Sequence, residues 1–275
     1  QAEAGIRDVA VTGVQTCALP ILLAKTVESV ITPALTGEDP RRIAHLVKRM
    51  DTILPGFEQA KAGVEMALWD ILGKEADMPL YALLGGKVRD FVQLSHSIWF
   101  GDPEKMAEFA QARAKDGFRT IKVKVGQSAD RDVAAVRLVR KAVGPDVRVR
   151  VDANMAWRTA KEAIAVIKRM EPHDIELVEQ PLPSRELDAM AEVRRNVGVP
   201  IMADESIFSP RDAMEVVRRG AADIANVYVS ESGGLLPAWR TFSLCELAGI
   251  PCMIGAMPEL GIGTAAHIHL GTAMT

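Results

Sequence analysis

The sequence predicts an α/β protein built as a TIM-like barrel of the (β/α)8 type, here (β/α)7β, and we expect the chain to stop before the last strand. Short β-branched segments alternate with charged amphipathic helices after residue 89. The repeat is ~30 residues long, which is typical of parallel strands joined by right-handed helical crossovers. Acidic residues also recur where strands end. A doubly wound open sheet is the alternative, but no glycine-rich loop follows the first expected strand.

The strand and helix pattern can be placed along the chain by the change between two-residue and helical periodicity. The expected strands are Val92–Trp99, Thr120–Val125, Val147–Asp152, Ile175–Glu179, Ile201–Ala203, Ile224–Val229 and Cys252–Ile254. The expected helices between them are Pro103–Lys115, Ala129–Val143, Ala160–Met170, Glu186–Asn196, Pro210–Arg219 and Pro237–Ala248.

Residues 22–90 have a helical pattern instead. Asp39 is placed to cap a helix that starts at Pro40, and apolar residues then recur at helical spacing up to Met50. A second helix is expected over Gln59–Lys74. Both helices carry an apolar face that needs a partner surface. The strand–helix alternation that follows places the incomplete barrel domain over 91–275.

The stretch VTGVQTCALPI, residues 11–21, fits no element. It has neither helical nor alternating periodicity, and its apolar run is short, without a cationic region before it or a small-residue cleavage site after it. This argues against a signal peptide. The string resembles the translation of a sequencing adapter, so we expect residues 1–21 to be non-native.

Composition points to small-molecule chemistry in a reducing compartment. The net charge is −3 with both signs interspersed, which argues against nucleic acid or an anionic membrane surface as partner. No apolar stretch approaches the ~20 residues that span a bilayer. Cys245 and Cys252 lack metal-ligand spacing, and the third cysteine, Cys17, lies in the suspected artefact, so a cytoplasmic protein is expected.

Three acids end consecutive expected strands: Asp152 in RVDAN, Glu179 in LVEQP and Asp204 in MADES. In a parallel barrel all strand carboxyl ends meet at one face, so these side chains should converge. Converging buried carboxylates repel one another unless a cation joins them, and hard oxygen ligands suit Mg²⁺. Taken singly, each has another interpretation: a helix cap for Asp152, a rim ion pair for Glu179 and a turn residue for Asp204.

Two lysines lie on the strand before these acids. In TIKVKVG, Lys122 and Lys124 are two residues apart and share a strand face, opposite Ile121, Val123 and Val125. Neighbouring ammonium groups disfavour each other's protonation, so the pKa of at least one should fall towards neutrality. Such a lysine could act as a base. Solvated lysines of an edge strand are the alternative, which a central barrel strand does not favour.

These motifs together resemble the enolase superfamily, in its mandelate racemase/muconate lactonizing enzyme family and there in the muconate lactonizing branch. The segment AKAGVEMALWDILGKEADMPLYALLGG is similar to the helical segment that precedes the barrel in that family. The resemblance covers residues 22–275. It implies that residues 22–90 are the remnant of an α+β capping domain, and that the chemistry is abstraction of a proton α to a carboxylate.

The resemblance also implies roles for the site residues. Asp152, Glu179 and Asp204 would hold Mg²⁺, which binds the substrate carboxylate. Lys124 would remove the α-proton, and the charge of Lys122 would stabilise the enolate.

Four further residues have supporting roles in this comparison. Glu259, in GAMPELGIG, would hydrogen-bond at the substrate carboxylate, and Asn154 and Gln180 would support the metal ligands. His96, late on the first expected strand, could face the substrate or be a core histidine bonded to backbone.

One departure from the family pattern reduces the number of reactions that the chain is expected to catalyse. The sixth strand of typical members ends in a second catalytic lysine, five residues before a Gly-Gly pair, but here IANVYVSESGG places Tyr228 there. Racemases and epimerases need a group on each face of the enolate. A tyrosine with a pKa of ~10 is a poor base but a serviceable proton donor. Tyr228 could also be a barrel-filling aromatic residue.

Elimination therefore fits better than epimerisation. Within the family, the motif VYVSE.GG resembles members that act on hydroxyproline-type substrates, so we expect a Mg²⁺-dependent dehydratase with cis-3-hydroxy-L-proline as the favoured substrate. An amino-acid or proline-betaine racemase or epimerase, another acid-sugar dehydratase, and a non-catalytic metal-binding barrel are the alternatives. The expected partner is a small-molecule carboxylate, with the intact protein forming a homo-oligomer as its family does.

Overall fold

The computed structural model describes residues 21–257 and 259–274, which form two compact units. The first unit takes its described residues from 21–88, 228–239 and 256–274, and the second from 89–227 and 240–255. The segment interpreted as a translated adapter lies outside the described residues except for Ile21. The domain boundaries expected at residues 21 and 90 stay predictions.

A parallel sheet of seven strands, in the order of the sequence, forms the core of the barrel region in the described residues. Its strands are β1 (His96–Ile98), β2 (Thr120–Lys124), β3 (Arg148–Asp152), β4 (Ile175–Glu179), β5 (Ile201–Ala203), β6 (Ile224–Tyr228) and β7 (Cys252–Gly255). The expected barrel-type α/β fold is confirmed. β1 is shorter than the expected Val92–Trp99, because residues 92–95 make no ladder and Leu94 and Trp99 are exposed.

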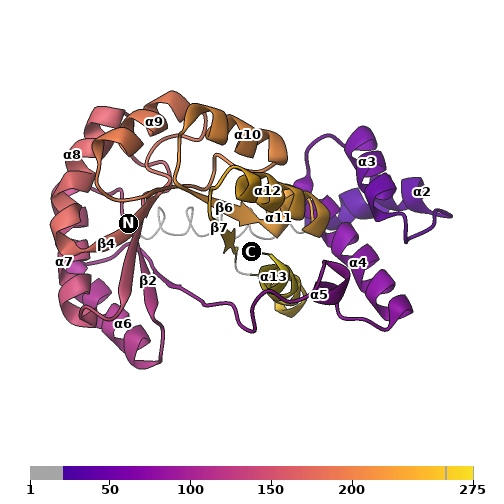
Figure 1. The fold of residues 1–275 in the computed structure, drawn as a ribbon, viewed down its shortest axis with the longest axis horizontal. Helices are drawn as coiled ribbons and strands as arrows, with labels where there is room; N and C mark the ends of the chain where they lie inside the picture. The colour runs from indigo at the N-terminus through magenta and orange to yellow at the C-terminus, as the bar shows by residue number, and fades with distance from the viewer. Residues whose placement is uncertain (1–20, 258, 275) are drawn as a thin grey trace, which may run out of the picture. The chain divides into compact units, whose positions relative to one another are not determined.

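Helices connect successive strands and form an outer arc around the sheet of the second unit (Figure 1). They are α6 (Pro103–Lys115), α7 (Ala129–Val143), α8 (Ala160–Met170), η2 (Glu171–His173), α9 (Leu187–Asn196) and α10 (Pro210–Arg219), and α12 (Leu235–Leu247) follows β6. Polar caps fix several starts, as the Thr159 hydroxyl accepts from the backbone N–H of Glu162 and the Ser209 hydroxyl from that of Asp212, both at 3.2 Å.

The strand register sets the level at which the site residues lie. Across neighbouring strands the Cα partners are Lys124 with Asp152 and Asp152 with Glu179. The intervening β2 residues Ile121 and Val123 are fully buried, as the alternation of the strand requires. The carboxyl ends of β2, β3 and β4 therefore present one lysine and two acids side by side.

The first unit is helical. It contains residues 21–26 in helical conformation and then η1 (Val27–Ile31), α2 (Thr32–Leu35), α3 (Ile43–Ile53), α4 (Glu58–Ala76), α5 (Leu80–Leu83), α11 (Val229–Ser232) and α13 (Gly261–Ala273). The expected helix over Gln59–Lys74 is confirmed as part of α4. None of the helices among the described residues is both long and apolar enough to cross a membrane.

The expected start of a helix at Pro40 is wrong. Asp39 does not cap α3, because its carboxylate accepts from the backbone N–H of Arg41 at 3.0 Å and from the Arg41 guanidinium at 2.9 Å. The helix begins at Ile43, after a turn closed by the Arg42 N–H and the Asp39 carbonyl. An Asp side chain that bonds two residues ahead forms a turn as readily as a helix cap.

Candidate active site

Three buried acids lie at the carboxyl ends of consecutive strands in the second unit. Asp152 and Glu179 are the last residues of β3 and β4, and Asp204 follows β5 directly. The first two are 0% exposed and the third 4% exposed. The structure therefore places the three predicted ligands at the same end of the sheet, where a parallel barrel gathers its functional groups.

The two lysines of β2 reach these acids. Lys122 Nζ lies 2.9 Å from Glu179 Oε1 and 3.0 Å from Asp152 Oδ2, so it bridges two of the carboxylates. Lys124 Nζ lies 2.7 Å from Asp152 Oδ2 and donates to Asn154 Oδ1 at 2.5 Å. Asp152 thus binds both ammonium groups. Lys124 also lies over the exposed ring of Trp99, 5.5 Å from its centroid.

The sequence analysis expected the pKa of at least one of the two lysines to fall, and that of Lys122 rises instead. Burial acts to lower its pKa, but the nearby carboxylates of Glu179 and Asp152 outweigh burial and raise it. The sequence argument considered only the neighbouring ammonium group. The acids of the next two strands reverse the direction of the Lys122 pKa shift.

Excess negative charge remains among the acids. Burial, and then repulsion from Asp152, raises the pKa of Glu179 to about 7 in spite of Lys122. Burial, followed by the charges of Glu179, Glu205 and Asp152, raises the pKa of Asp204 to about 9. Buried carboxylates that repel each other in this way are stabilised by a cation.

The donor set suits Mg²⁺. In the part of the chain that the structure describes, no three acidic, histidine or cysteine residues surround a common ion position. The Lys122 ammonium bridges two of the carboxylates, and the Asn226 amide nitrogen lies 3.4 Å from Glu179 Oε1 and 3.3 Å from Asp204 Oδ1. Buried carboxylate oxygens of this kind are the ligands that Mg²⁺ prefers.

Two polar residues of this cluster were missed by the sequence analysis. Glu205 Oε2 and Asn226 Oδ1 are buried oxygens without a hydrogen-bond partner among the described residues, which leaves acceptors for a ligand or cation. Glu205 also accepts from Asn154 Nδ2 at 3.0 Å. The sequence held a clue in each case, since Glu205 follows Asp204 directly and Asn226 lies two residues before Tyr228 on one strand.

Gln180 fixes the segment that carries Asp204. Its backbone adopts a left-handed conformation with φ 34°, unusual for a residue other than glycine. Its side-chain oxygen accepts from the N–H of Asp204 at 2.9 Å and of Ser206 at 3.3 Å, while its nitrogen donates to the carbonyl of Leu182 at 2.8 Å. Gln180 is fully buried. It therefore acts on the candidate site through backbone groups on two loops.

Replacing Gln180 with alanine is expected to lower the free energy of unfolding by about 3 kcal/mol, because several buried backbone groups lose their partner. Urea unfolding of the two proteins would measure the difference. Gln127→Ala is the matched control, since Gln127 is exposed and its side-chain oxygen accepts from the Arg131 guanidinium at 2.9 Å. Equal effects of the two substitutions would contradict this role of Gln180.

The geometry around His96 favours a core histidine. The Cα partner of His96 is Ile121, so its side chain shares the face of Ile121 and not that of the lysines. Its ring packs against Phe118 and Phe109, with centroids 4.9 and 5.6 Å apart. Burial, and then the charge of Arg113, lowers its pKa.

Tyr228 and Glu259, the other two predicted site residues, belong to the first unit. Tyr228 is 7% exposed and ends β6, two residues after Asn226 and so on the same strand face. Glu259 Oε1 accepts from the backbone N–H of Met257 at 2.9 Å and lies 3.6 Å from His267 Nε2. Their catalytic roles stay predictions.

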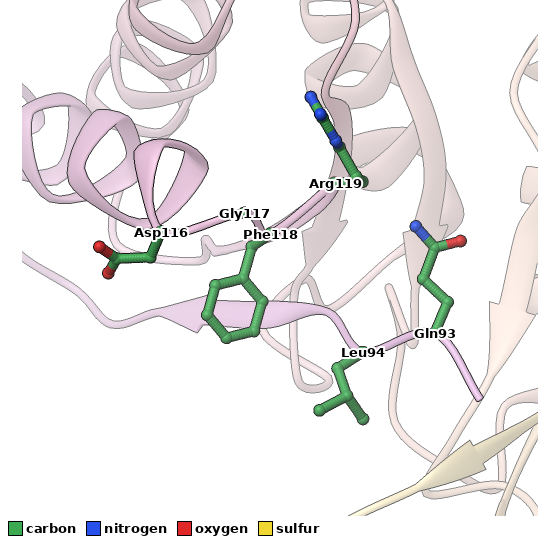
Figure 2. A pocket seen from close by; sticks show the side chains of 6 residues that line it. All are labelled: Gln93, Leu94, Asp116, Gly117, Phe118 and Arg119. Atoms are coloured by element: carbon green, nitrogen blue, oxygen red, sulfur yellow. The ribbon is translucent and has the colours of Figure 1, made fainter. Parts of the chain in front are cut away.

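A shallow hollow of about 240 Å³ lies elsewhere in the second unit, lined by Gln93, Leu94, Asp116, Gly117, Phe118 and Arg119. Figure 2 shows these residues on the segment before β1 and on the connection that leads into β2. Both segments precede their strands. The hollow is therefore at the opposite end of these strands from the acids and lysines.

Comparisons with known proteins agree with this geometry. Residues 105–275 match the family model described as enolase C-terminal domain-like, and residues 1–85 match that of the mandelate racemase/muconate lactonizing enzyme N-terminal domain. The second match includes residues 11–21, whose non-native origin stays a prediction.

Several known enzymes are similar over most of this chain. A hydrophobic dipeptide epimerase of Enterococcus faecalis is 39% identical over 251 residues, which are 90% of this chain and 70% of that protein. A solved structure of a dipeptide epimerase from Enterococcus faecalis, complexed with Mg and the dipeptide L-Leu-L-Tyr, has a TM-score of 0.88 at 39% identity over 92% of this chain and 73% of that chain. A cis-3-hydroxy-L-proline dehydratase of Roseibium aggregatum is 34% identical over 240 residues, 87% of this chain and 64% of that protein.

The chain spans about two thirds of the length of the relatives that it matches. The matched models cover residues 1–85 and 105–275, and the parallel sheet with acids at the carboxyl ends of β3, β4 and β5 is the arrangement expected from the sequence motifs. The chain belongs to the mandelate racemase/muconate lactonizing enzyme family of the enolase superfamily.

Proposed function

We propose that this chain belongs to a Mg²⁺-dependent dehydratase that removes the proton α to a carboxylate and then expels a β-hydroxyl group. The observation that carries the proposal is the pair Lys122 and Lys124, hydrogen-bonded to buried acids of the next two strands. Abstraction of a weakly acidic α-proton requires a base, and it requires positive charge near the carboxylate, which a cation held by clustered acids can supply.

The acids Asp152, Glu179 and Asp204 would hold the Mg²⁺. When bound, the ion would supply positive charge for the substrate carboxylate. Glu205 and Asn226 contribute the two partnerless oxygens described above, which could accept from bound water or substrate.

Proton transfer would begin at Lys124. In its neutral form its amine would accept the α-proton, and the electron pair of the C–H bond would form the enolate. The ammonium of Lys122, held at 2.9 Å by Glu179, would remain charged and stabilise that enolate. The enolate would then expel the β-hydroxyl group.

Tyr228 would complete the elimination. Its phenol would give a proton to the departing hydroxyl, which leaves as water, and Tyr228 would recover a proton from solvent. The overall change is loss of one water molecule from the substrate. A tyrosine in place of the expected second lysine therefore favours lyase chemistry over return of a proton to the second face.

The favoured substrate is cis-3-hydroxy-L-proline. Its α-hydrogen and hydroxyl lie on opposite ring faces, as an anti elimination needs, and one similar protein carries that dehydratase name. An amino-acid or dipeptide epimerase is the second candidate, because proteins of that kind reach 39% identity.

Incubation of the full-length protein with Mg²⁺ and cis-3-hydroxy-L-proline in D₂O distinguishes the candidates. A dehydratase forms the pyrroline carboxylate. An epimerase, given dipeptides or amino acids, incorporates deuterium at the α-carbon of both epimers without loss of water. A binding protein gives neither result, and that outcome would overturn the proposal.

Tyr228→Phe sharpens this test. It is expected to slow water loss by about 10²-fold, because the general acid is gone, while α-hydrogen exchange through Lys124 continues. Nuclear magnetic resonance of the α-proton alongside product assay measures both rates. Unchanged water loss in Tyr228→Phe would remove Tyr228 from the mechanism.

A further inference from the structure

A buried carboxylate outside the strand-end cluster, that of Glu65 on α4, lies in the first unit. It is 0% exposed. Its oxygens accept from the indole N–H of Trp69 at 2.8 Å and from the backbone N–H groups of Leu235 at 2.7 Å and Leu236 at 2.8 Å. Burial raises the pKa of Glu65, and these donors oppose that rise. A buried carboxylate is costly without such charge-assisted bonds, so the donors fix where it lies.

Leu235 and Leu236, which supply the two backbone donors, are the first residues of α12. Their N–H groups belong to the first turn of a helix, which lacks partners within the helix and carries the positive end of its dipole. Glu65 therefore caps α12 from another helix, 170 residues away in the sequence. The start of α12 cannot shift without breaking these bonds.

The Gly-Gly pair before α12 fits tightly against α4. Gly234 has φ 129°, and a Cβ built on it would lie 2.5 Å from Glu65 Cδ and 2.8 Å from Glu65 Cγ. A Cβ on Gly233 would lie 2.9 Å from Glu58 Oε2. A side chain at Gly234 would collide with the buried Glu65, and the positive φ of both glycines, 92° and 129°, disfavours any other residue.

The same segment begins at Tyr228. Tyr228 precedes the short helix α11, which packs on α4, and the N–H of Gly234 closes the segment by donating to the carbonyl of Val229 at 2.9 Å. Residues 228–236 thus form a closed turn with one end on β6 and the other held by Glu65. The hydrogen bond from Gly234 to Val229 therefore links the end that Glu65 holds to the residue that follows Tyr228.

We propose that Glu65 is a positioning residue, which holds the turn 228–236 so that the Tyr228 phenol is oriented for the elimination step. This inference rests on the proposed role of Tyr228. A carboxylate that served the stability of the helix alone would not affect one step of the reaction more than another.

Glu65→Gln separates these two roles by kinetics in D₂O. Glutamine keeps the size of the side chain, but one carboxylate oxygen becomes an NH₂ group, which cannot accept from the N–H donors. Exchange of the substrate α-hydrogen is expected to stay within about twofold of the parent while water loss falls about tenfold or more, because only the proton donor is displaced. An equal fall in both rates, or no fall in water loss, would overturn the inference.

Two further variants keep the test decisive. Glu75→Gln is the matched control on the same helix, as Glu75 is exposed and binds Arg41 at 3.4 Å, and it should alter neither rate. Glu65→Asp keeps the charge on a shorter side chain and is expected to show a smaller change in the same direction. It replaces Glu65→Gln if that variant does not fold, with the same criteria.

A spectroscopic measurement tests the inference even if the proposed reaction is wrong. The chain has two tyrosines, Tyr81 and Tyr228, so 3-fluorotyrosine labelling gives two assignable ¹⁹F resonances. Glu65→Gln should shift or broaden the Tyr228 resonance and leave that of Tyr81, which stacks on His269. An unchanged Tyr228 resonance, or equal changes in both, would overturn the positioning role.

Discussion

Replacing Lys124 with glutamine is expected to slow exchange of the substrate α-hydrogen by about 10³-fold, the usual order for loss of a general base. The fold should survive, because Asp152 keeps the Lys122 ammonium at 3.0 Å when Lys124 is gone. Proton exchange in D₂O, followed by nuclear magnetic resonance, measures the rate, and thermal unfolding checks the fold.

Lys122→Gln should behave differently from Lys124→Gln. Glu179 is fully buried and Lys122 is its cationic partner, so removing Lys122 is expected to lower both thermal stability and activity. Lys168→Gln, an exposed change on the outer helix α8, is the control and should alter neither. If Lys124→Gln exchanged the α-hydrogen at the parent rate, Lys124 would not be the base.

The strand ends were predictable because a parallel sheet leaves little freedom. Once Lys124, Asp152 and Glu179 are assigned to the carboxyl ends of neighbouring strands, the Cα pairing of β2, β3 and β4 places them side by side. Period-two burial of β2 then decides which face the lysines share. These features depend on local sequence and on the topology of the fold.

Interactions across the sheet could not be predicted in the same way. The sign of the Lys122 pKa shift depends on how near Glu179 and Asp152 come to its ammonium, which no spacing along one strand reveals. The bonds of Glu65 to the start of α12 join residues 170 apart, so α4 looked like an ordinary amphipathic helix. α13 was missed, since Gly261–Ala273 contains three glycines and no charged residue to mark a helical face.

Hydrophobicity alone also misled the assignment of the first strand. The expected strand began at Val92, yet Leu94 is 66% exposed and the ladder begins only at His96. Apolar residues in a connection cannot be told from strand residues by periodicity over so short a stretch. The placement of the lysines and of the strand-end acids was unaffected, because they come from later strands.

Addition of Mg²⁺ is expected to raise the melting temperature of the metal-free protein by about 5–10 °C at a concentration near 100 Kd, since binding to the folded state alone adds about 2.7 kcal/mol. The cation would relieve the repulsion among Asp152, Glu179 and Asp204. NaCl at equal ionic strength should not reproduce the effect. Thermal unfolding after treatment with EDTA measures it.

The gain should grow between pH 6 and pH 8. The pKa of Asp204 is raised to about 9 in the folded, metal-free protein, so its carboxyl group holds a proton that the ion must displace. At Asp204 the folded state holds a proton that the unfolded state lacks in this range, so the contribution of this carboxyl group to metal-free stability falls as pH rises. Mg²⁺ competes better as protons become scarcer, which enlarges its stabilising effect at pH 8.

Asp204→Asn tests whether this carboxylate carries the effect. The amide has no proton to lose and is a weaker ligand, so the metal-free variant should lose less stability with rising pH, gain little from Mg²⁺ and turn over substrate about 10³-fold more slowly. Asp188→Asn, at an exposed carboxylate on α9, is the control and should keep the full response to Mg²⁺. A full Mg²⁺ response in Asp204→Asn would mean that the ion binds elsewhere, because a site built from these buried acids cannot lose one negative ligand without losing affinity.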